Sequence, residues 1–450
     1  MSEIKKIKKG LNINLKGKAE KVFIKAKPSE TYAVKPIDFA GLMPKLSVVE
    51  GDEVKAGTTL FYSKSDSRIK FTAPMCGRVK EIIRGERRKI QEVIIEACDK
   101  IEYETFVKAD PSSLDRKAII ENLLESGLWP SIKQRPYNII ANPDNTPKSI
   151  FISGIDSAPL GVDYDFLMQD CEKEFQVGVH ALRKLTKGNV HLSINGKYPP
   201  VKAFKNVKNT EIHKFTGPHP VGNVGTQIHH IDPINKGEIV WTVEPQNVVM
   251  IGKLFLNGRY DARKIVALTG SEVYKPRYYK VISGCCITSL TEDNVRKGNQ
   301  RYISGNVLTG KQIEPDGYLG FYDSSVTIIP EGNEYKFLGW LSPGFNKFSS
   351  SPSFLSRLIP NKEFTINSNL NGGRRALMIT GQFEKVFPMD IYPMQLLKAI
   401  IIEDIDLMEK LGIYEVAEED FALCEFVDTS KTEIQAIVRK GLDLMIKEMN

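Results

Sequence analysis

The 450-residue sequence predicts a multidomain α+β protein, and three observations indicate this fold class. Residues 1–105 contain short runs of β-branched and aromatic residues separated by glycine, proline and aspartate, the pattern of a small all-β domain. Residues 106–255 alternate strand-like and helix-like segments, which favours a parallel α/β domain. Residues 388–450 place apolar side chains at helical spacing. A chain of this length holds about two to four domains.

Two half-motifs define the N-terminal unit. Val/Leu strands are separated by Gly-Asp and Ala-Gly in residues 44–57, and by Ala-Pro and a glycine in residues 71–79. These are turn signals between the strands of a small barrel-like sandwich. The pattern resembles the biotinyl/lipoyl carrier fold, a barrel-sandwich hybrid. The expected strands are Ala19–Ala26, Lys45–Val49, Thr58–Tyr62, Ile69–Thr72, Arg78–Ile83 and Gln91–Glu96.

The lysine that carrier domains modify is missing from its expected place. In those domains it sits at a hairpin tip, eight residues before the proline of the second half-motif. Counting back from Pro74 places Asp66 there, and Lys64 and Arg68 are out of register. We therefore expect the scaffold without a swinging arm. A carrier modified at Lys64 is the alternative, and an unmodified intact mass would exclude it.

The second unit, residues 106–255, is expected to be α/β and Rossmann-like. Helices are predicted at Asp115–Glu125 and Asp170–Leu185, and buried strands at Ser149–Gly154 and Val190–Ile194. Neither GxGxxG nor GxxxxGKS/T follows any of these strands. No standard dinucleotide or P-loop site is therefore predicted.

The rest of the chain divides into three further units. Residues 256–330 are predicted to form a β-grasp module of the soluble ligand-binding type, and residues 331–387 a β-rich connecting segment with exposed loops at 347–353 and 367–373. Residues 388–450 are predicted to be helical. One helix is expected at Pro393–Leu411, and a last helix should open with a capping box at residues 430–433.

Composition excludes several classes of protein. Apolar residues make up 41% and charged residues 26%, as in ordinary soluble domains. No run approaches the roughly 18 apolar residues of a spanning helix, and the N-terminus lacks the apolar core of a secretion signal. The six cysteines contain no CxxC, so neither a zinc site nor an iron–sulfur cluster is indicated. Cys285 and Cys286 could form a redox switch, but two reduced thiols are favoured.

Basic residues concentrate near the N-terminus. Residues 1–27 carry nine lysines and two glutamates, which equals the net charge of +7 of the whole chain. Such patches attract anionic headgroups or acidic partners. A solvated sheet edge is the alternative. Nucleic acid is not expected, because no aromatic side chains interleave with the charges. The predicted docking patch consists of Lys5, Lys6, Lys8, Lys9, Arg84, Arg87 and Arg88.

Histidines gather in a turning loop rather than at metal-ligand spacing. His213, His219, His229, His230 and Asp232 fall within twenty residues, but at irregular intervals around a Gly/Pro-rich loop. We therefore predict no metal site and expect these side chains to cap turns or shape a cleft. The loop could admit a ligand close to its backbone or simply join domains. No nucleophile stands near a base in sequence, so no catalytic residue is predicted.

Several longer strings resemble the A subunit of the Na⁺-translocating NADH:quinone reductase. The match extends over nearly the whole chain, and the strings together are far more specific than any one. They are Arg84-Gly85-Glu86-Arg87-Arg88 after Gly77-Arg78-Val79, residues 217–222 and 225–233, residues 251–255 with Gly258-Arg259, residues 390–393 and residues 418–427.

That family is similar to the C subunit of Rnf complexes and to the flavin subunit of respiratory complex I. Those relatives bind FMN and NADH with a glycine-rich loop, and iron–sulfur clusters with cysteine-rich segments. Here the loop is not found, and Cys424 stands alone with Asp428 nearby. The resemblance implies a complex I flavin-subunit-like scaffold without a tightly bound cofactor.

The resemblance also implies a function. The chain would be a peripheral subunit on the cytoplasmic face of the inner membrane, in a six-subunit pump that oxidises NADH, reduces a quinone such as ubiquinone and exports Na⁺. Flavins and iron centres would belong to partner subunits, and the isolated chain would not be catalytic. A quinone contact shared with the membrane-embedded neighbour is implied, for which His219, His229 and His230 offer donors. The alternative is a stand-alone soluble ligand-binding module of sandwich plus β-grasp type.

Overall fold

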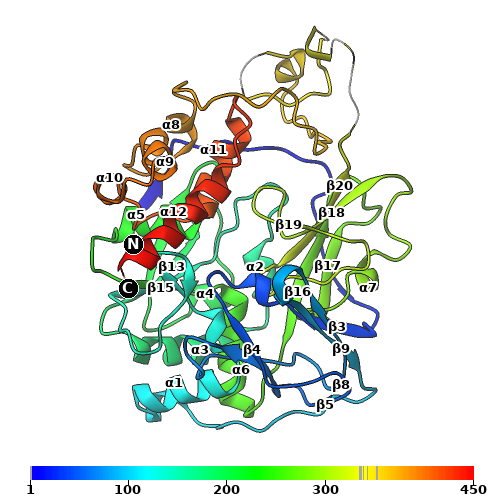
Figure 1. The fold of residues 1–450 in the computed structure, drawn as a ribbon, viewed down its shortest axis with the longest axis vertical. Coiled ribbons are helices and arrows are strands. Elements are labelled where there is room, and N and C mark those ends of the chain that lie inside the picture. The colour runs from blue at the N-terminus through cyan, green and yellow to red at the C-terminus, as the bar shows by residue number, and fades with distance from the viewer. Residues whose placement is uncertain (1–2, 334–336, 338, 342, 351–352, 450) are drawn as a thin grey trace.

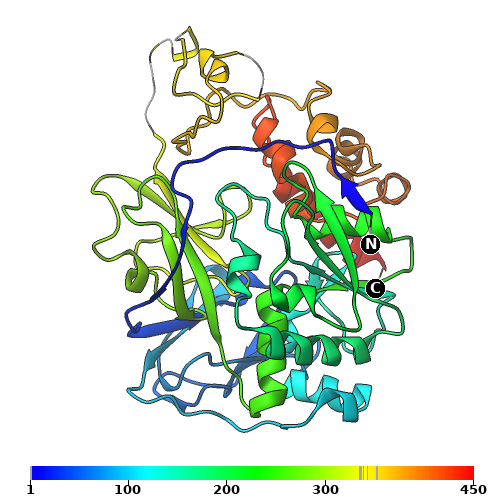
Figure 2. The same cartoon turned by 180° about the vertical axis from the view of Figure 1, so that it is seen from behind.

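A computed structural model describes residues 3–333, 337, 339–341, 343–350 and 353–449. Within these residues the strands form four sheets, of seven, six, four and three strands. In Figures 1 and 2, the two smaller sheets and the helices α1, α3 and α6 lie at one end of the molecule. The described residues 343–350 and 353–380, drawn in yellow and orange, project from the opposite end. The predicted loop at 347–353 includes residues 351 and 352, which lie outside the described residues.

The seven-stranded sheet confirms the predicted α/β domain. Strands β12, β13 and β14 run parallel, β15 is parallel to β12, and β10 and β11 form an antiparallel edge. Its order is β1 (Ile4–Lys6), β14 (Glu211–Thr216), β13 (Val190–Asn195), β12 (Ser149–Ser153), β15 (Val240–Thr242), β10 (Lys133–Arg135) and β11 (Ile139–Ile140).

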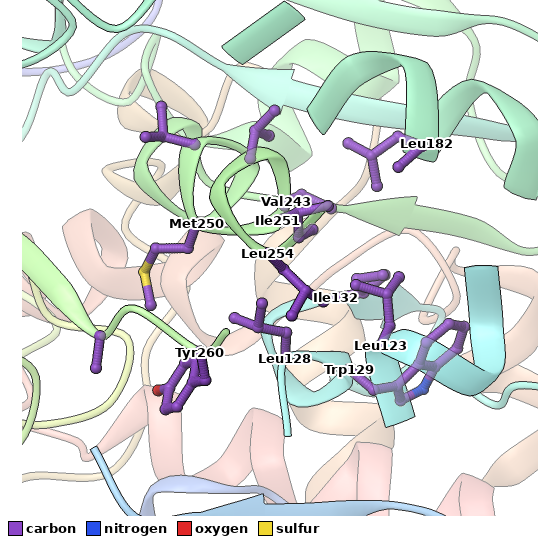
Figure 3. Close-up of a cluster of buried hydrophobic side chains, with 14 of the residues drawn as sticks. Leu123, Leu128, Trp129, Ile132, Leu182, Val243, Met250, Ile251, Leu254 and Tyr260 are labelled. Atoms are coloured by element: carbon purple, nitrogen blue, oxygen red, sulfur yellow. The ribbon is translucent and has the colours of Figure 1, made fainter. Parts of the chain in front are cut away.

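Helices cover both faces of this sheet. Ile150 and Ile152 belong to one core with α1 (Arg116–Glu125), α3 (Glu172–Leu185) and α6 (Pro245–Asn257), whereas Phe151 packs with α5 (Val224–Ile231) on the other face. This alternation follows from the two-residue period of a strand. Figure 3 shows apolar side chains of α3 and α6 gathered in one buried cluster with Leu123 and Trp129.

Glycines set the distance between α3 and α6. A Cβ on Gly252 would lie 1.8 Å from the Glu174 carbonyl oxygen, and one on Gly178 would lie 2.1 Å from the Val248 carbonyl oxygen. Both values are far below any van der Waals contact. The two backbones therefore approach each other only because both positions lack a side chain.

The two smaller sheets form the predicted barrel-sandwich hybrid. Cys76 and Cys98, not predicted to pair, are joined by a disulfide at the base of the β8–β9 hairpin. The other four cysteines are free. The strands are β3 (Thr31–Val34), β9 (Ile90–Ala97), β8 (Gly77–Arg84) and β5 (Glu53–Val54) in one sheet, and β4 (Pro44–Leu46), β6 (Thr59–Ser63) and β7 (Lys70–Thr72) in the other.

The hairpin tip between β6 and β7 is tied to the α/β domain. Arg68 donates hydrogen bonds to the Asp66 carboxylate, at 3.0 and 2.7 Å, and to the Asp144 carboxylate, at 2.8 and 2.7 Å. Because the tip is pinned where a carrier domain would hold a mobile lysine, it suits a scaffold rather than a swinging arm.

The six-stranded sheet contains a strand that was expected in the barrel-sandwich hybrid. The segment predicted at Ala19–Ala26 forms β2, which pairs with β17 and not with the sandwich strands, and β1 pairs with β14. The N-terminal residues thus join other domains. The order is β19 (Lys311–Ile313), β18 (Gln300–Ser304), β20 (Ser325–Pro330), β16 (Arg263–Thr269), β17 (Arg277–Ile282) and β2 (Glu20–Lys25).

The C-terminal helices depart from prediction at two points. The helix expected at Pro393–Leu411 is broken into α9 (Pro393–Ile401) and α10 (Ile405–Lys410), because Glu403 adopts a left-handed φ of 57° and Asp404 caps the second helix. The capping box at Ser430 does not form: its hydroxyl donates to the Ala376 carbonyl, and the helix starts later. The remaining helices are α2 (Tyr164–Leu167), α4 (Lys202–Lys205), α7 (Thr288–Thr291), α8 (Phe383–Val386), α11 (Ala422–Val427) and α12 (Ile434–Met449).

Candidate functional site

A cleft of about 600 Å³ lies where the parallel strands of the α/β domain end. The ends of β12 and β15 and the starts of α5 and α6 line one side, and residues 305–311 and 321–325 of the six-stranded-sheet domain line the other. Part of the C-terminal segment, including Glu418 and Arg439, completes the wall. Open α/β sheets bind their ligands at this position, outside the carboxyl ends of the strands. The cleft is therefore the candidate binding site.

Carboxylates outnumber cations in the lining of this cleft. Such a surplus disfavours the phosphates of a flavin or nicotinamide nucleotide and suits a neutral ligand. The acidic residues are Asp38, Asp156, Glu244, Asp323, Glu418 and Glu419, and the basic ones are Lys133, Lys311 and Arg439.

Glu244 is the most perturbed carboxyl group of the cleft. It stands before Pro245, at the first turn of α6, and its side chain makes no capping hydrogen bond there. Burial raises its pKa to about 7, although Lys264 and Lys133 pull in the opposite direction. A carboxyl group with this pKa exchanges a proton near neutral pH, which is the range of a general acid or base.

Aromatic rings and hydrogen-bond donors form another part of the cleft wall. The Lys133 ammonium lies 3.8 Å from the centroid of the Tyr322 ring, and the Tyr322 hydroxyl donates to the Pro130 carbonyl at 2.7 Å. Tyr164 and Asn247 also line the cleft, and burial raises the pKa of Tyr164. These groups offer a flat apolar surface beside hydrogen-bond donors.

His219 is the one histidine of the three quinone-contact candidates that lines this cleft. Its Nδ1 lies 3.0 Å from the Ser157 hydroxyl, and its backbone N–H donates to Asn12 at 3.0 Å. Burial lowers its pKa to about 4, so the imidazole is neutral at physiological pH. Ser157 also accepts from the Gly222 N–H at 2.7 Å, which fixes the loop that carries His219.

His229 and His230 lie on α5, outside the lining of the cleft, and make structural hydrogen bonds there. The Asp390 N–H donates to His229 Nε2 at 3.0 Å, so His229 Nδ1 carries the proton that it donates to Glu415 at 2.8 Å. His230 Nδ1 donates to the Thr226 carbonyl at 2.9 Å, and burial lowers its pKa. The structure therefore brings neither ring to the cleft wall.

A buried ion pair attaches the C-terminal segment to the α/β domain. Arg135, 1% exposed, pairs with Asp420 at 2.7 Å and with Glu419 at 2.6 Å. A Cβ on Gly225 would lie within 2.5 Å of both the Arg135 guanidinium and the Asp420 carboxylate. Gly225, in the first turn of α5, thus makes room for the ion pair that holds the wall of the cleft.

The predicted docking patch falls in two separate places. Lys5 and Lys6 lie on β1, at the edge of the seven-stranded sheet, followed by the exposed Lys8 and Lys9. The exposed residues Arg84, Arg87 and Arg88 lie at the turn between β8 and β9. Figures 1 and 2 place the N-terminal strand beside α5 and the C-terminal helices, away from the end of the molecule that holds this hairpin. They cannot form one continuous patch.

Sequence reasoning missed most of the cleft residues. Lys133, Glu244 and Tyr322 come from three segments of the chain that are far apart in sequence. One signal was readable: Glu244 and Pro245 follow the apolar run of β15, and proline favours the first position of a helix. That signature marks a strand end facing a helix start, which is where a ligand of such a sheet binds.

The domains of this fold indicate the class of protein to which the chain belongs. A barrel-sandwich hybrid is joined to an α/β domain, and a family model for the NqrA N-terminal barrel-sandwich hybrid domain matches residues 5–98. A model for the NqrA second alpha/beta domain matches residues 114–260, and one for the NQRA C-terminal domain matches residues 265–314. Among the described residues, no helix is long and apolar enough to cross a bilayer.

Curated relatives then identify the family. Proteins named as the A subunit of Na(+)-translocating NADH-quinone reductase from Hahella chejuensis, Neisseria meningitidis and Pasteurella multocida are each 37% identical to this chain. Each alignment covers 98% of this chain and 99% of the relative. The chain belongs to the family of the A subunits of Na(+)-translocating NADH-quinone reductase.

Likeness to solved structures is weaker. The NAD+-reducing NiFe hydrogenase matches in its air-oxidized and H2-reduced states with TM-scores of 0.39 and 0.40, at 10% and 12% identity. Each match covers 75% of this chain, and this chain spans 62% of the length of the hydrogenase chain. These TM-scores are too low to support an argument.

Proposed function

We propose that this chain is the peripheral A-type subunit of a Na⁺-translocating NADH:quinone reductase and serves there as a scaffold. The observation that carries this proposal is end-to-end identity of 37% with relatives of that name. In this proposal the chain docks at the cytoplasmic face of the membrane, binds no flavin or iron centre of its own and is not catalytic in isolation. The other subunits carry the redox centres and the Na⁺ path.

A quinone headgroup is the ligand that we propose for the cleft. A quinone is flat and uncharged, and its two carbonyl oxygens accept hydrogen bonds. The Lys133 ammonium, the Tyr322 ring and the neutral His219 imidazole suit these features, while the surplus of carboxylates disfavours a phosphorylated cofactor. Of the three histidines proposed as contacts, His219 is thus the one we retain.

The finer organisation of the chain is also a proposal. We infer that residues 256–330 form a β-grasp ligand-binding module against the cleft, with residues 1–105, 106–255, 331–387 and 388–450 as the other units. The C-terminal helices are grouped as one unit because they share an apolar core, which Ile13 and Leu15 of the N-terminal segment also enter and which includes Leu396, Leu397, Val438 and Leu442.

The protruding segment is the proposed docking surface for the membrane-embedded partner. Large apolar side chains are exposed at unusual density there, and such patches mark interaction sites. Lys347 and Lys362 accompany them, whereas Arg374 pairs with Glu433 at 2.7 Å. The apolar side chains include Leu341, Phe345, Leu355, Leu358, Ile359, Leu370, Met378 and Ile379.

A pull-down tests the subunit proposal. The tagged chain would be recovered from membranes dissolved in mild detergent, its partners identified, and NADH-to-quinone activity measured on the eluate. Membrane-embedded partners with Na⁺-stimulated activity are expected. If the chain elutes alone and inactive while the complex is intact by other markers, the stand-alone ligand-binding module replaces this proposal.

The Lys133→Met variant of the assembled complex tests the quinone site. Because a hydrogen bond to a charged group contributes about 1.5–3 kcal/mol, the KM for quinone should rise at least about tenfold, with the NADH side of the reaction unchanged. Lys45→Met is the matched control, since Lys45 lies over the Tyr62 ring in the sandwich domain. Equal kinetics in both variants would place the quinone elsewhere.

A further inference from the structure

Two neighbouring strands place three potential metal ligands on one face of the seven-stranded sheet. In the parallel register of β13 and β14, His191 lies opposite Glu211, and His213 follows two residues later on the same strand as Glu211. Residues two apart point to the same face of a strand. All three side chains therefore lie on the face that α5 covers.

The distances between the three potential ligand atoms are already similar to those around a bound metal ion. His191 Nδ1 lies 3.0 Å from His213 Nε2 and 3.3 Å from Glu211 Oε2, and His213 Nε2 lies 3.9 Å from the same oxygen. A tetrahedral ion with bonds of about 2.0–2.1 Å separates its ligand atoms by about 3.3 Å. Octahedral neighbours would all lie at about 3.0 Å. The three observed distances between ligand atoms lie below, at and above the tetrahedral value.

Surrounding residues orient this set. Asn189 donates to Glu211 Oε1 at 2.7 Å, which leaves Oε2 turned toward the imidazoles. The Phe151 ring stacks on His191 at 4.7 Å between centroids, so the imidazole, whose side chain is 7% exposed, is held in place. Outer contacts of this kind fix the orientation of metal ligands.

The charges nearby permit a cation. The 3.0 Å hydrogen bond between His191 Nδ1 and His213 Nε2 requires one of these nitrogens to carry a proton and the other to offer its lone pair. If the proton of the donating ring moves to that ring's other nitrogen, His191 Nδ1 and His213 Nε2 both have a lone pair available for an ion. Lys5 is the opposing charge, and it is held by the His230 carbonyl.

We propose that His191, Glu211 and His213 form a binding site for one divalent transition-metal ion, Zn²⁺ in the first instance. Two imidazoles and one carboxylate are a ligand set that Zn²⁺ accepts. The fourth position faces solvent, because the Glu211 side chain is 52% exposed. The site is separate from the quinone cleft, whose lining includes none of these residues.

The test uses the full chain, purified with a tag that contains no histidine and stripped of metal. Zn²⁺ is titrated against a chromophoric chelator, and Co²⁺ is added separately to record its visible absorption. We expect one Zn²⁺ per chain and the intense bands of four-coordinate Co²⁺. The weak bands of six-coordinate Co²⁺, or no binding of either ion, would overturn the assignment.

Variants locate the ion. Glu211→Gln changes an exposed side chain and should fold normally, and both it and His213→Gln should weaken Zn²⁺ binding by at least about tenfold, as should Asn189→Ala through the orientation of Glu211. Lys5→Gln should tighten binding. His180→Gln, on α3, is the control and should leave binding unchanged. If Zn²⁺ binds Glu211→Gln and His213→Gln as it binds the wild type, the proposed site is wrong.

Discussion

The interaction between Arg135 and Asp420 concentrates a large energetic effect in two side chains. Both are 1% exposed, and no water can replace a lost partner. Replacing Arg135 leaves Asp420 as an uncompensated buried charge, and replacing Asp420 leaves the buried Arg135 with Glu419 as its one remaining carboxylate partner, a penalty greater than that of losing an ordinary hydrogen bond. This pair explains why the C-terminal segment stays against the α/β domain although the two are far apart in sequence.

Asp420→Asn should therefore destabilise the chain by about 3 kcal/mol, because the substitution keeps the shape and removes the charge that Arg135 requires. Urea unfolding of the isolated chain measures this loss. Asp443→Asn removes the exposed partner of Arg439 and should cost less than about 0.5 kcal/mol. Equal effects of the two substitutions would mean that the existing pair with Glu419 is enough to compensate the charge of Arg135.

Glu244 predicts a pH dependence of stability. Its pKa is raised from 4.5 to about 7 in the folded chain, so the folded state binds the proton more tightly than the unfolded state. The wild type should lose unfolding free energy relative to Glu244→Gln as the pH rises from 4.5 to about 7, by roughly 1.4 kcal/mol for each unit of the shift. Above that range the difference should stay constant.

Urea unfolding of both proteins at a series of pH values measures this difference. Glu53→Gln removes a charge from an exposed position in the sandwich domain and reports the general effect of one fewer carboxylate. A gap between wild type and Glu244→Gln that stays level across the series would show that Glu244 is solvated in the folded chain.

At the scale of elements, the contact between α3 and α6 depends on the absence of a methyl group. Gly252→Ala should destabilise the chain by about 1–3 kcal/mol or more, because the new Cβ meets the Glu174 carbonyl at 1.8 Å. The sign is opposite to that of helix propensity, which favours alanine over glycine by about 1 kcal/mol. Thermal unfolding measures the effect.

Gly373→Ala is the matched control, since a Cβ there meets nothing within 4 Å. Its effect should stay within about 0.5 kcal/mol. A Gly252→Ala protein as stable as this control would show that the two helices can move apart at no cost.

Elements were predictable where the local pattern and the tertiary environment agree. Five of the seven sandwich strands and the helices α1 and α3 lie within a few residues of their expected bounds, whereas the strands β3 and β5 were not predicted. Asp115, for example, caps α1 by accepting from the Ala118 N–H at 2.8 Å. The break at Glu403 was not predictable, because continuous apolar spacing hides a left-handed turn. Ser430 failed as a cap because a distant carbonyl at Ala376 engages its hydroxyl.

The candidate site was less predictable than the elements. Its residues converge from strands and loops whose neighbours in space are set by sheet order, and sheet order is not visible in local periodicity. The histidines illustrate this: His213 and His219 do not join His229 and His230, whose rings lie 5.2 Å apart between centroids, whereas His191 Nδ1 lies 3.0 Å from His213 Nε2 although the two residues are 22 positions apart. The register between parallel strands determines which of these side chains lie close together.

At the scale of the whole molecule, the N-terminal segment connects three units. Strand β1 pairs with β14, Ile13 and Leu15 enter the core of the C-terminal helices, and β2 pairs with β17. Figure 2 shows this segment (dark blue) running across the back of the molecule. It links these units across their boundaries.

A chain that starts at Ala19 should therefore lose stability far from the cut. Burial of a large aliphatic side chain contributes about 1.5–3 kcal/mol, and the cut removes Ile7, Ile13 and Leu15, all less than 9% exposed. Hydrogen exchange should speed up in β14 and in α9 and α12. Lys6→Gln with Lys8→Gln keeps the segment and should leave exchange unchanged. Full protection in the shortened chain would contradict the linking role.

The same segment constrains how the protein is made. Lys5 pairs with Phe215, and Leu15 with Phe364, so both leave the ribosome hundreds of residues before their partners. At about 5–20 residues per second, Lys5 waits roughly 10–40 s for β14. During that interval Ile7, Ile13 and Leu15 are exposed on a nascent chain among lysines, and chaperones have time to bind them. The last-made helices must then pack against Ile13 and Leu15, which are among the first residues to be synthesised.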